Sequence, residues 1–173
     1  TTNYDPLGRK TIFEDLPKNL PRVVTVGRLD FNSEGLLLLT NSGSLARYLE
    51  LPKNSFIREY KVKVKGEINI QKLKKLEKGI IIKGIKYERI KINILEKNKD
   101  YAWIKMKLLE GKNREIRKII NFFGWSVNKL KRISYGPIQL KEIKKNEVKE
   151  INISKYFKKI PWELFQENLE VKN

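Results

Sequence analysis

The stretch GRLDFNSEGLLLLTN, residues 27–41, is the most informative part of the chain. It places one carboxylate, Asp30, in a loop that a glycine brackets on each side. Apolar residues precede and follow this loop, so we expect short strands at Val23–Val26 and Leu36–Thr40. A polar group on a loop between rigid strands is a common arrangement for active-site residues, although an isolated Gly-x-x-Asp is more often an ordinary turn.

Alternation of apolar and charged residues predicts further strands outside this stretch. Tyr60, Val62 and Val64 share one face, and lysines occupy the other. The other expected strands are 90–94, 102–108, 127–134, 138–140 and 148–153. Three short helices are expected, at Leu45–Leu49 after a cap at Ser44, at Ile70–Lys78, and from a cap at Asn113 to Phe123. The predicted fold class is therefore α+β, a mostly antiparallel sheet with a few short flanking helices.

Composition excludes several classes of site. The 173 residues contain neither Cys nor His, which excludes a thiol nucleophile, a Cys/His zinc site and disulfides. We expect no metal and no cofactor. The formal charge of +18 is typical of a protein that binds a polyanion such as nucleic acid. Drift toward lysine codons in an AT-rich genome is the alternative origin of that charge.

The chain has no apolar run of the roughly 18 residues that a membrane-spanning helix needs. We therefore expect no membrane partner. A cytoplasmic location is the default expectation, with which the absence of Cys agrees, and the protein is expected to be a monomer.

Residues 27–41 closely resemble the motif around the catalytic aspartate of pseudouridine synthases, in the branch that modifies bacterial ribosomal RNA (the RsuA, RluB, RluE and RluF type). Four other strings resemble this family at matching positions: DPLGRKT at 5–11, EYKVKVKG at 59–66, EGKNREIRK at 110–118 and LKRISYGPIQL at 130–140. The strings around residues 58–60 and 135–140 favour the RluB type, which acts on large-subunit (23S) rather than small-subunit (16S) rRNA. Glu115 stands where glutamine is common in the family.

The resemblance implies a catalytic domain with a central cleft over residues 1–160, followed by a peripheral tail at 161–173. Members of the family usually begin with an S4-type RNA-binding domain, which has no match in this chain. We therefore interpret the sequence as a fragment.

The family's reaction converts a specific uridine of rRNA to pseudouridine, which requires one carboxylate near the ribose of a flipped-out nucleotide. The resemblance implies that Asp30 is that carboxylate, acting either through an ester at C1′ or through a glycal. Tyr60 would stack on the detached base. Arg28 would fill the space left by the flipped base, and Leu130 would also contact substrate.

A helical wheel of 116–123 places Arg117 at the edge of the apolar stripe, where a guanidinium can reach the cleft and pair with Asp30. Nine Lys/Arg between residues 105 and 132 form an expected phosphate-contacting flank. The residues assigned to RNA binding are Lys112, Arg114, Lys118, Lys131 and Arg132.

Two other functions fit part of the sequence. A non-catalytic RNA-binding or ribosomal protein would explain the charge and the aromatic residues, but it would not explain Asp30, Tyr60 and Arg117 in three separate matching strings. A basic glycosidase-like enzyme usually needs two carboxylates, and no second acidic motif is present.

Overall fold

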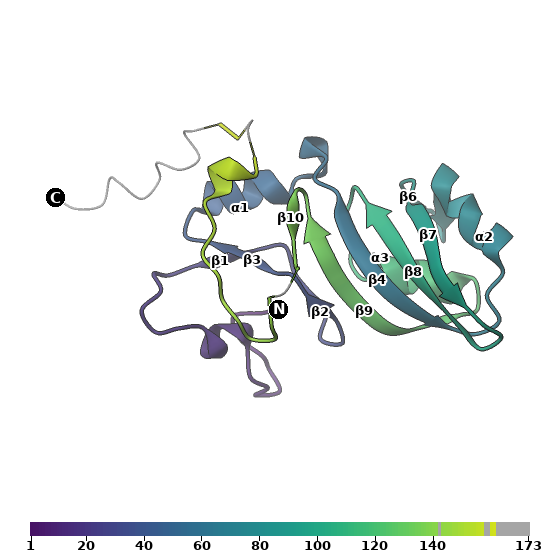
Figure 1. The fold of residues 1–173 in the computed structure, drawn as a ribbon, viewed down its shortest axis with the longest axis horizontal. Helices are drawn as coiled ribbons and strands as arrows, with labels where there is room; N and C mark the ends of the chain where they lie inside the picture. The colour runs from purple at the N-terminus through teal and green to yellow at the C-terminus, as the bar shows by residue number, and fades with distance from the viewer. Residues whose placement is uncertain (142, 158–159, 162–173) are drawn as a thin grey trace.

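A six-stranded sheet dominates the computed structural model, which describes residues 1–141, 143–157 and 160–161 (Figure 1). Its hydrogen-bonded strand order is β10 (Ile138–Gln139), β9 (Ser126–Tyr135), β4 (Arg58–Lys65), β8 (Tyr101–Leu108) and β7 (Lys91–Lys97). These strands pair antiparallel, and the short β2 (Glu34–Gly35) pairs with β9 in parallel. The predicted α+β class with a mostly antiparallel sheet is confirmed.

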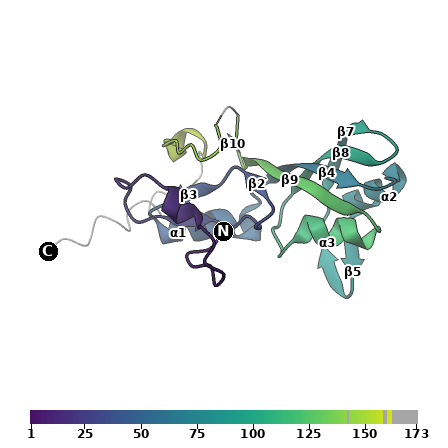
Figure 2. The ribbon, with the colours of Figure 1, turned by 90° about the horizontal axis from the view of Figure 1, so that it is seen from below.

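One face of this sheet is covered by α3 (Glu115–Phe122), as Figure 2 shows. Alternate strand residues such as Val62 and Ile104 are fully buried, and they pack with Ile119 and Ile120 of α3 in one apolar cluster. The helix α2 (Ile70–Lys74) and the 3-10 turn η3 (Lys75–Lys78) close one end of this cluster. The alternation of apolar and charged residues in the strands thus arises because the sheet is covered on one side only.

A second, smaller apolar cluster lies beyond the β10 edge of the sheet. It is built on β1 (Val24–Val26), β3 (Leu38–Thr40) and α1 (Gly43–Glu50). Strands β1 and β3 pair antiparallel, so they form the two sides of the loop that contains Asp30. The end of β9 contributes Tyr135 to the same cluster, which joins the two parts of the fold.

Several local predictions are wrong. The cap of α1 is Ser42, whose hydroxyl accepts a hydrogen bond from the backbone of Leu45 at 3.1 Å, and not Ser44. Residues 148–152 form no strand, and Ile153–Lys155 is a 3-10 turn. The hairpin of β5 (Ile80–Ile82) and β6 (Ile85–Tyr87) was not expected.

The remaining elements are the 3-10 turns η1 (Ile12–Asp15) and η2 (Pro52–Asn54). In the described part of the chain, no helix is both long and apolar enough to cross a membrane. The predicted tail at 161–173 lies outside the described residues after position 161.

The contact between β2 and β9 requires a glycine at position 35. Gly35 has φ +109°, and a Cβ added there would lie 2.2 Å from the backbone oxygen of Arg132. Any side chain would therefore separate the two strands, because both the left-handed conformation and the close approach exclude it.

We expect Gly35→Ala to lower the free energy of unfolding by about 2 kcal/mol or more, since it combines strain with a backbone clash. Urea unfolding followed by circular dichroism measures the loss. The matched control is Gly43→Ala in α1, where a Cβ meets no atom within 4 Å. This control should be neutral or stabilising by up to about 1 kcal/mol. Equal stability of the two variants would contradict the role given to Gly35.

Candidate active site

The loop that contains Asp30 is fixed from several directions. The backbone amide of Gly27 donates to Glu50 Oε1 at 2.7 Å, which ties the start of the loop to α1. The amino group of Thr1 donates to the Leu29 carbonyl at 2.7 Å, and Leu29 N donates to Thr1 Oγ1 at 3.0 Å. A turn follows, in which Ser33 N donates to the Asp30 carbonyl at 2.9 Å. Asp30 is thus presented by a loop whose two sides are anchored.

Two arginines from the start of α3 flank the Asp30 carboxylate. Arg117 Nε lies 3.7 Å and Arg114 Nη1 lies 3.8 Å from Asp30 Oδ2. These distances are ion-pair distances and exceed those of a hydrogen bond. The side chain of Arg117 is 12% exposed, whereas that of Arg114 is 50% exposed. Arg117 is therefore the cation that is built into the site, and Arg114 lies at its rim.

Arg117 also holds the loop itself. Its Nη2 donates to the Asn32 carbonyl at 2.6 Å, and its Nη1 donates to the Val127 carbonyl at 3.3 Å. One planar guanidinium thus connects α3, β9 and the loop of Asp30. Burial, followed by the nearby charge of Arg114, lowers the pKa of Arg117. The Nε of Arg117 is buried and has no hydrogen-bond partner among the described residues, so Asp30 Oδ2 at 3.7 Å is its charged neighbour.

The start of α3 differs from the prediction. Asn113 is not the cap; Arg114 occupies that position in the left-handed conformation with φ +51°. Instead, Glu115 accepts a hydrogen bond from Lys112 N at 2.9 Å, and Glu115 N donates to the Lys112 carbonyl at 3.1 Å. This turn directs Arg114 and Arg117 toward Asp30.

Tyr60 lies on the face of the sheet that α3 covers. It is half-buried and packs against the apolar cluster that α3 shares. Its cross-strand partners are Met106 of β8 and Arg132 of β9. Arg28, by contrast, is exposed, and its Nε donates to the Thr1 carbonyl at 3.1 Å.

Two predicted contact residues are buried in the structure. Arg132 was assigned to the RNA surface, but it is only 2% exposed, so this assignment is corrected. Its Nε donates to the Leu36 carbonyl at 2.7 Å, directly after β2. Arg132 therefore binds the backbone at the end of the Asp30 loop. Leu130 is 6% exposed and belongs to the main apolar cluster, so the structure places it in the core.

The expected basic flank of residues 105–132 is divided between two faces, which corrects the prediction of one surface. Lys112 and Lys118 are exposed on the α3 side, where the ammonium of Lys112 pairs with Glu110 and that of Lys118 donates to Asn113 Oδ1 at 3.4 Å. Lys131 instead lines the opposite, uncovered face of the sheet. The side-chain alternation of β8 and β9 causes this division.

Sequence reasoning missed a pair of buried carboxyl groups behind the arginines. Glu110 and Glu115 are 8% and 4% exposed, and Glu88 N donates to Glu110 Oε1 at 2.9 Å. Burial, with a smaller contribution from the neighbouring Glu110, raises the pKa of Glu115 to about 7. Glu115 Oε1 has no hydrogen-bond partner in the described part of the chain. The only sign of this pair in the sequence is that Glu110 and Glu115 occur in the otherwise basic string 110–118.

An exposed aromatic ring next to Asp30 was also missed. Phe31 is 72% exposed, and the guanidinium carbon of Arg9 lies 4.4 Å from its ring centroid. Among the described residues, no group of three or more Asp or Glu side chains is arranged to hold a metal ion. The groups that the structure brings together here are the Asp30 carboxylate, Arg114 and Arg117.

Comparison with known proteins gives a consistent result. Residues 4–122 match the family described as RNA pseudouridylate synthase. A Rickettsia felis protein named uncharacterized RNA pseudouridine synthase is 52% identical over 152 residues, 88% of this chain and 66% of its own length. A Buchnera aphidicola protein named ribosomal large subunit pseudouridine synthase B is 42% identical over 163 residues, 92% of this chain and 63% of its own length. The chain thus spans just under two thirds of these two relatives.

A solved structure supports the same fold. The crystal structure of a pseudouridylate synthase superimposes with a TM-score of 0.75 at 23% identity, covering 84% of this chain and 64% of that one.

We expect Glu115→Gln to stabilise the protein by about 1–3 kcal/mol at pH 8 and to have little effect at pH 5. The raised pKa means that the folded state holds a proton which the unfolded state releases at pH values above about 4.5. Stability of the wild type therefore falls as the pH rises from about 4.5 to about 7 and is constant above that. Glutamine removes this loss, because its amide is neutral and can donate to Glu110.

Urea unfolding between pH 4.5 and pH 8.5 measures this difference. The control is Glu67→Gln, at an exposed glutamate, which should follow the wild type at every pH. A constant difference between Glu115→Gln and the wild type across the pH range would refute the assignment.

Proposed function

Because this chain belongs to the RNA pseudouridylate synthase family, we propose that it isomerises a uridine of ribosomal RNA to pseudouridine and that Asp30 is its catalytic carboxylate. The observation that carries the proposal is the position of Asp30 on an anchored loop, with the buried Arg117 at 3.7 Å. Residues 1–160 form the catalytic domain in this proposal, which acts as a monomer in the cytoplasm and without a cofactor.

The reaction breaks the bond between uracil N1 and ribose C1′ and joins C5 to C1′. N1 gains a proton and C5 loses one, so atoms balance without an oxidant or another reactant. Asp30 acts at the ribose in one of two ways: its oxygen attacks C1′, or it removes the proton from C2′ to give a glycal. Both routes require an oriented carboxylate, and the Arg117 guanidinium lies at ion-pair distance, where it can orient the carboxylate of Asp30.

The target base must leave its stack to reach a carboxylate on this loop. Extrusion costs a few kcal/mol, which contacts to the backbone and a side chain in the vacated space offset. Arg28 is exposed two residues before Asp30 and is suited to fill that space. Tyr60, on the α3 side of the sheet, stacks on the detached uracil while it turns. The exposed Lys112, Arg114 and Lys118 contact phosphates at the rim of the site.

Large-subunit (23S) rRNA is the proposed target. Two relatives named ribosomal large subunit pseudouridine synthase B, from Buchnera aphidicola and Yersinia pestis, are 42% and 40% identical to this chain. The support is their similarity across 92% and 80% of the chain.

We expect Asp30→Asn to abolish turnover and to leave RNA binding intact. The amide is a poor nucleophile and a poor base, so either route stops at its first step. Release of tritium from rRNA labelled at uridine C5 measures turnover, and filter binding of the same RNA measures affinity. The control is Asp100→Asn, an exposed aspartate in the turn between β7 and β8.

A loss of less than about tenfold, which is about 1.4 kcal/mol of barrier, is too small for the essential carboxylate and would contradict the assignment. Retained activity would also follow if Asp30 only stabilised its own turn, because asparagine serves equally well there.

A further inference from the structure

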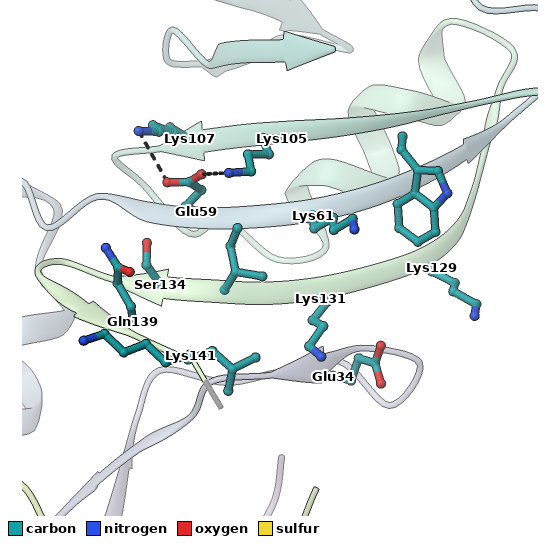
Figure 3. Close-up of a pocket in the computed structure, with 13 residues that line it drawn as sticks. Glu34, Glu59, Lys61, Lys105, Lys107, Lys129, Lys131, Ser134, Gln139 and Lys141 are labelled. Carbon is teal, nitrogen blue, oxygen red and sulfur yellow. Dashed lines mark ion pairs between the residues drawn. The ribbon is translucent and has the colours of Figure 1, made fainter. Parts of the chain in front are cut away.

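The face of the main sheet that α3 leaves uncovered carries a dense group of lysines. Figure 3 shows this face, with α3 behind the sheet. We call it the lysine face and define it by Lys61, Lys63, Lys105, Lys107, Lys129 and Lys131, which alternate with buried residues on β4, β8 and β9. Together with neighbouring side chains, most of these lysines line a shallow hollow of about 620 Å³.

The lysines stand opposite one another across the strands. Lys61 is the cross-strand partner of Lys105 on one side and of Lys131 on the other. Lys63 is likewise paired with Lys129. Adjacent strands lie about 4.8 Å apart, and like charges directly opposite each other destabilise a sheet. The isolated protein therefore carries a row of mutually repelling cations that a bound polyanion would relieve.

The acidic residues of this face do not neutralise the row. Glu59 pairs with Lys105 at 3.6 Å and with Lys107 at 3.3 Å. Glu34 lies at the β2 edge as the cross-strand partner of Lys131. At the β7 edge, Glu96 is the cross-strand partner of Trp103 and accepts a hydrogen bond from the Tyr101 hydroxyl at 2.7 Å. The six lysines thus face three carboxylates, and Lys61, Lys63 and Lys129 have none of the three as a cross-strand or ion-pair partner.

The aromatic rings of this face are already in contact with lysines. The ammonium of Lys61 lies 4.9 Å from the ring centroid of Trp103, and that of Lys63 lies 4.1 Å from that of Tyr101. Cations over these rings compete with unstacked bases for the same surface. This arrangement favours a ligand that presents phosphates over a single strand that presents bases.

We propose that the lysine face binds the phosphate backbone of double-stranded RNA, as a second RNA contact separate from the site of Asp30. The two surfaces lie on opposite sides of the sheet, since Arg117 belongs to α3 on the covered side. The loop of Asp30 leads into Glu34 at the β2 edge, so a structured RNA can reach from one surface to the other. The identification of the polyanion as RNA rests on the proposed function; the charge arrangement itself does not.

The test is the triple variant Lys61→Gln, Lys129→Gln and Lys131→Gln, with a 20-base-pair RNA duplex made only of G·C pairs as the probe. This duplex contains no uridine, so its binding does not depend on isomerisation. Affinity is measured by fluorescence anisotropy from 50 to 300 mM salt. We expect binding about tenfold weaker than wild type and a salt slope reduced by about two to three.

The matched control neutralises Lys72, Lys74 and Lys75, which are exposed on and beside α2 and carry the same total charge. This control should bind the duplex within about twofold of wild type, and the thermal midpoint of the lysine-face variant should equal or exceed that of the wild type, because repulsion is removed. An equal loss in both triple variants would indicate a general charge effect and would overturn the proposal. Unchanged affinity of the lysine-face variant would do the same.

A third measurement separates RNA from an anionic lipid surface. Vesicles of phosphatidylglycerol are used in a flotation assay, and the proposal expects the lysine-face variant and the α2 control to behave alike. Loss of vesicle binding in the lysine-face variant alone, with duplex affinity retained, would assign this face to a membrane. A protein that fails to isomerise uridine yet shows the expected duplex binding would contradict the proposed function and leave this inference standing.

Discussion

The short parallel pairing of β2 with β9 connects the two parts of the fold, and the candidate site depends on it. Leu36 N donates to the Arg132 carbonyl at 2.8 Å, and Arg132 Nε donates back to the Leu36 carbonyl at 2.7 Å. The Nε of the buried Arg132 is satisfied by this bond, whereas its Nη2 is buried and has no hydrogen-bond partner among the described residues. The glycine at position 35 permits the close approach. This connection fixes the end of the Asp30 loop on β9, and the bond from Arg117 to the Asn32 carbonyl fixes the same loop to α3.

The arrangement of charges around Asp30 follows from where each element begins. Helix α3 starts at a residue with positive φ, and the turn before it is closed by Glu115 rather than by a short polar cap. Arg114 and Arg117, at the start of α3, therefore lie against the loop of Asp30. Glu110 and Glu115 are buried. Glu110 pairs with Lys112, and neither glutamate has an ion pair with Arg117 among the described residues, so Arg117 is available to the aspartate.

Much of the fold was predictable because one-sided burial imposes a period of two on the strands. Val62, Val64 and Ile104 reveal β4 and β8 in the sequence for that reason. The proximity of Asp30 and Arg117 was also predictable, since a helical wheel places Arg117 at the edge of the apolar stripe of α3. This prediction concerned geometry, and the catalytic roles remain proposals.

Other features were not readable from the sequence. Arg132 follows the buried Leu130 by two residues, so alternation alone puts it on the covered face. Its partner could not be predicted, because that partner is the carbonyl of Leu36, 96 residues away. The partnership of Glu110 and Glu115 likewise depends on a turn whose conformation is set by packing. The division of the basic flank between two faces depends on which face α3 covers, and alternation within a strand does not give that.

The bond between Arg132 and Leu36 spans 96 residues, and the bond between Arg117 and the Asn32 carbonyl spans 85. Contacts of such sequence separation form slowly, because the closure entropy of the intervening chain must be overcome first. During synthesis, the loop of Asp30 emerges from the ribosome long before β9 exists. The nascent chain therefore carries Asp30 before Arg132 and Arg117, the two arginines that bond to its loop, have been synthesised. The site is completed only when the last strands have been translated, so assembly of this surface is tied to the end of translation of this domain.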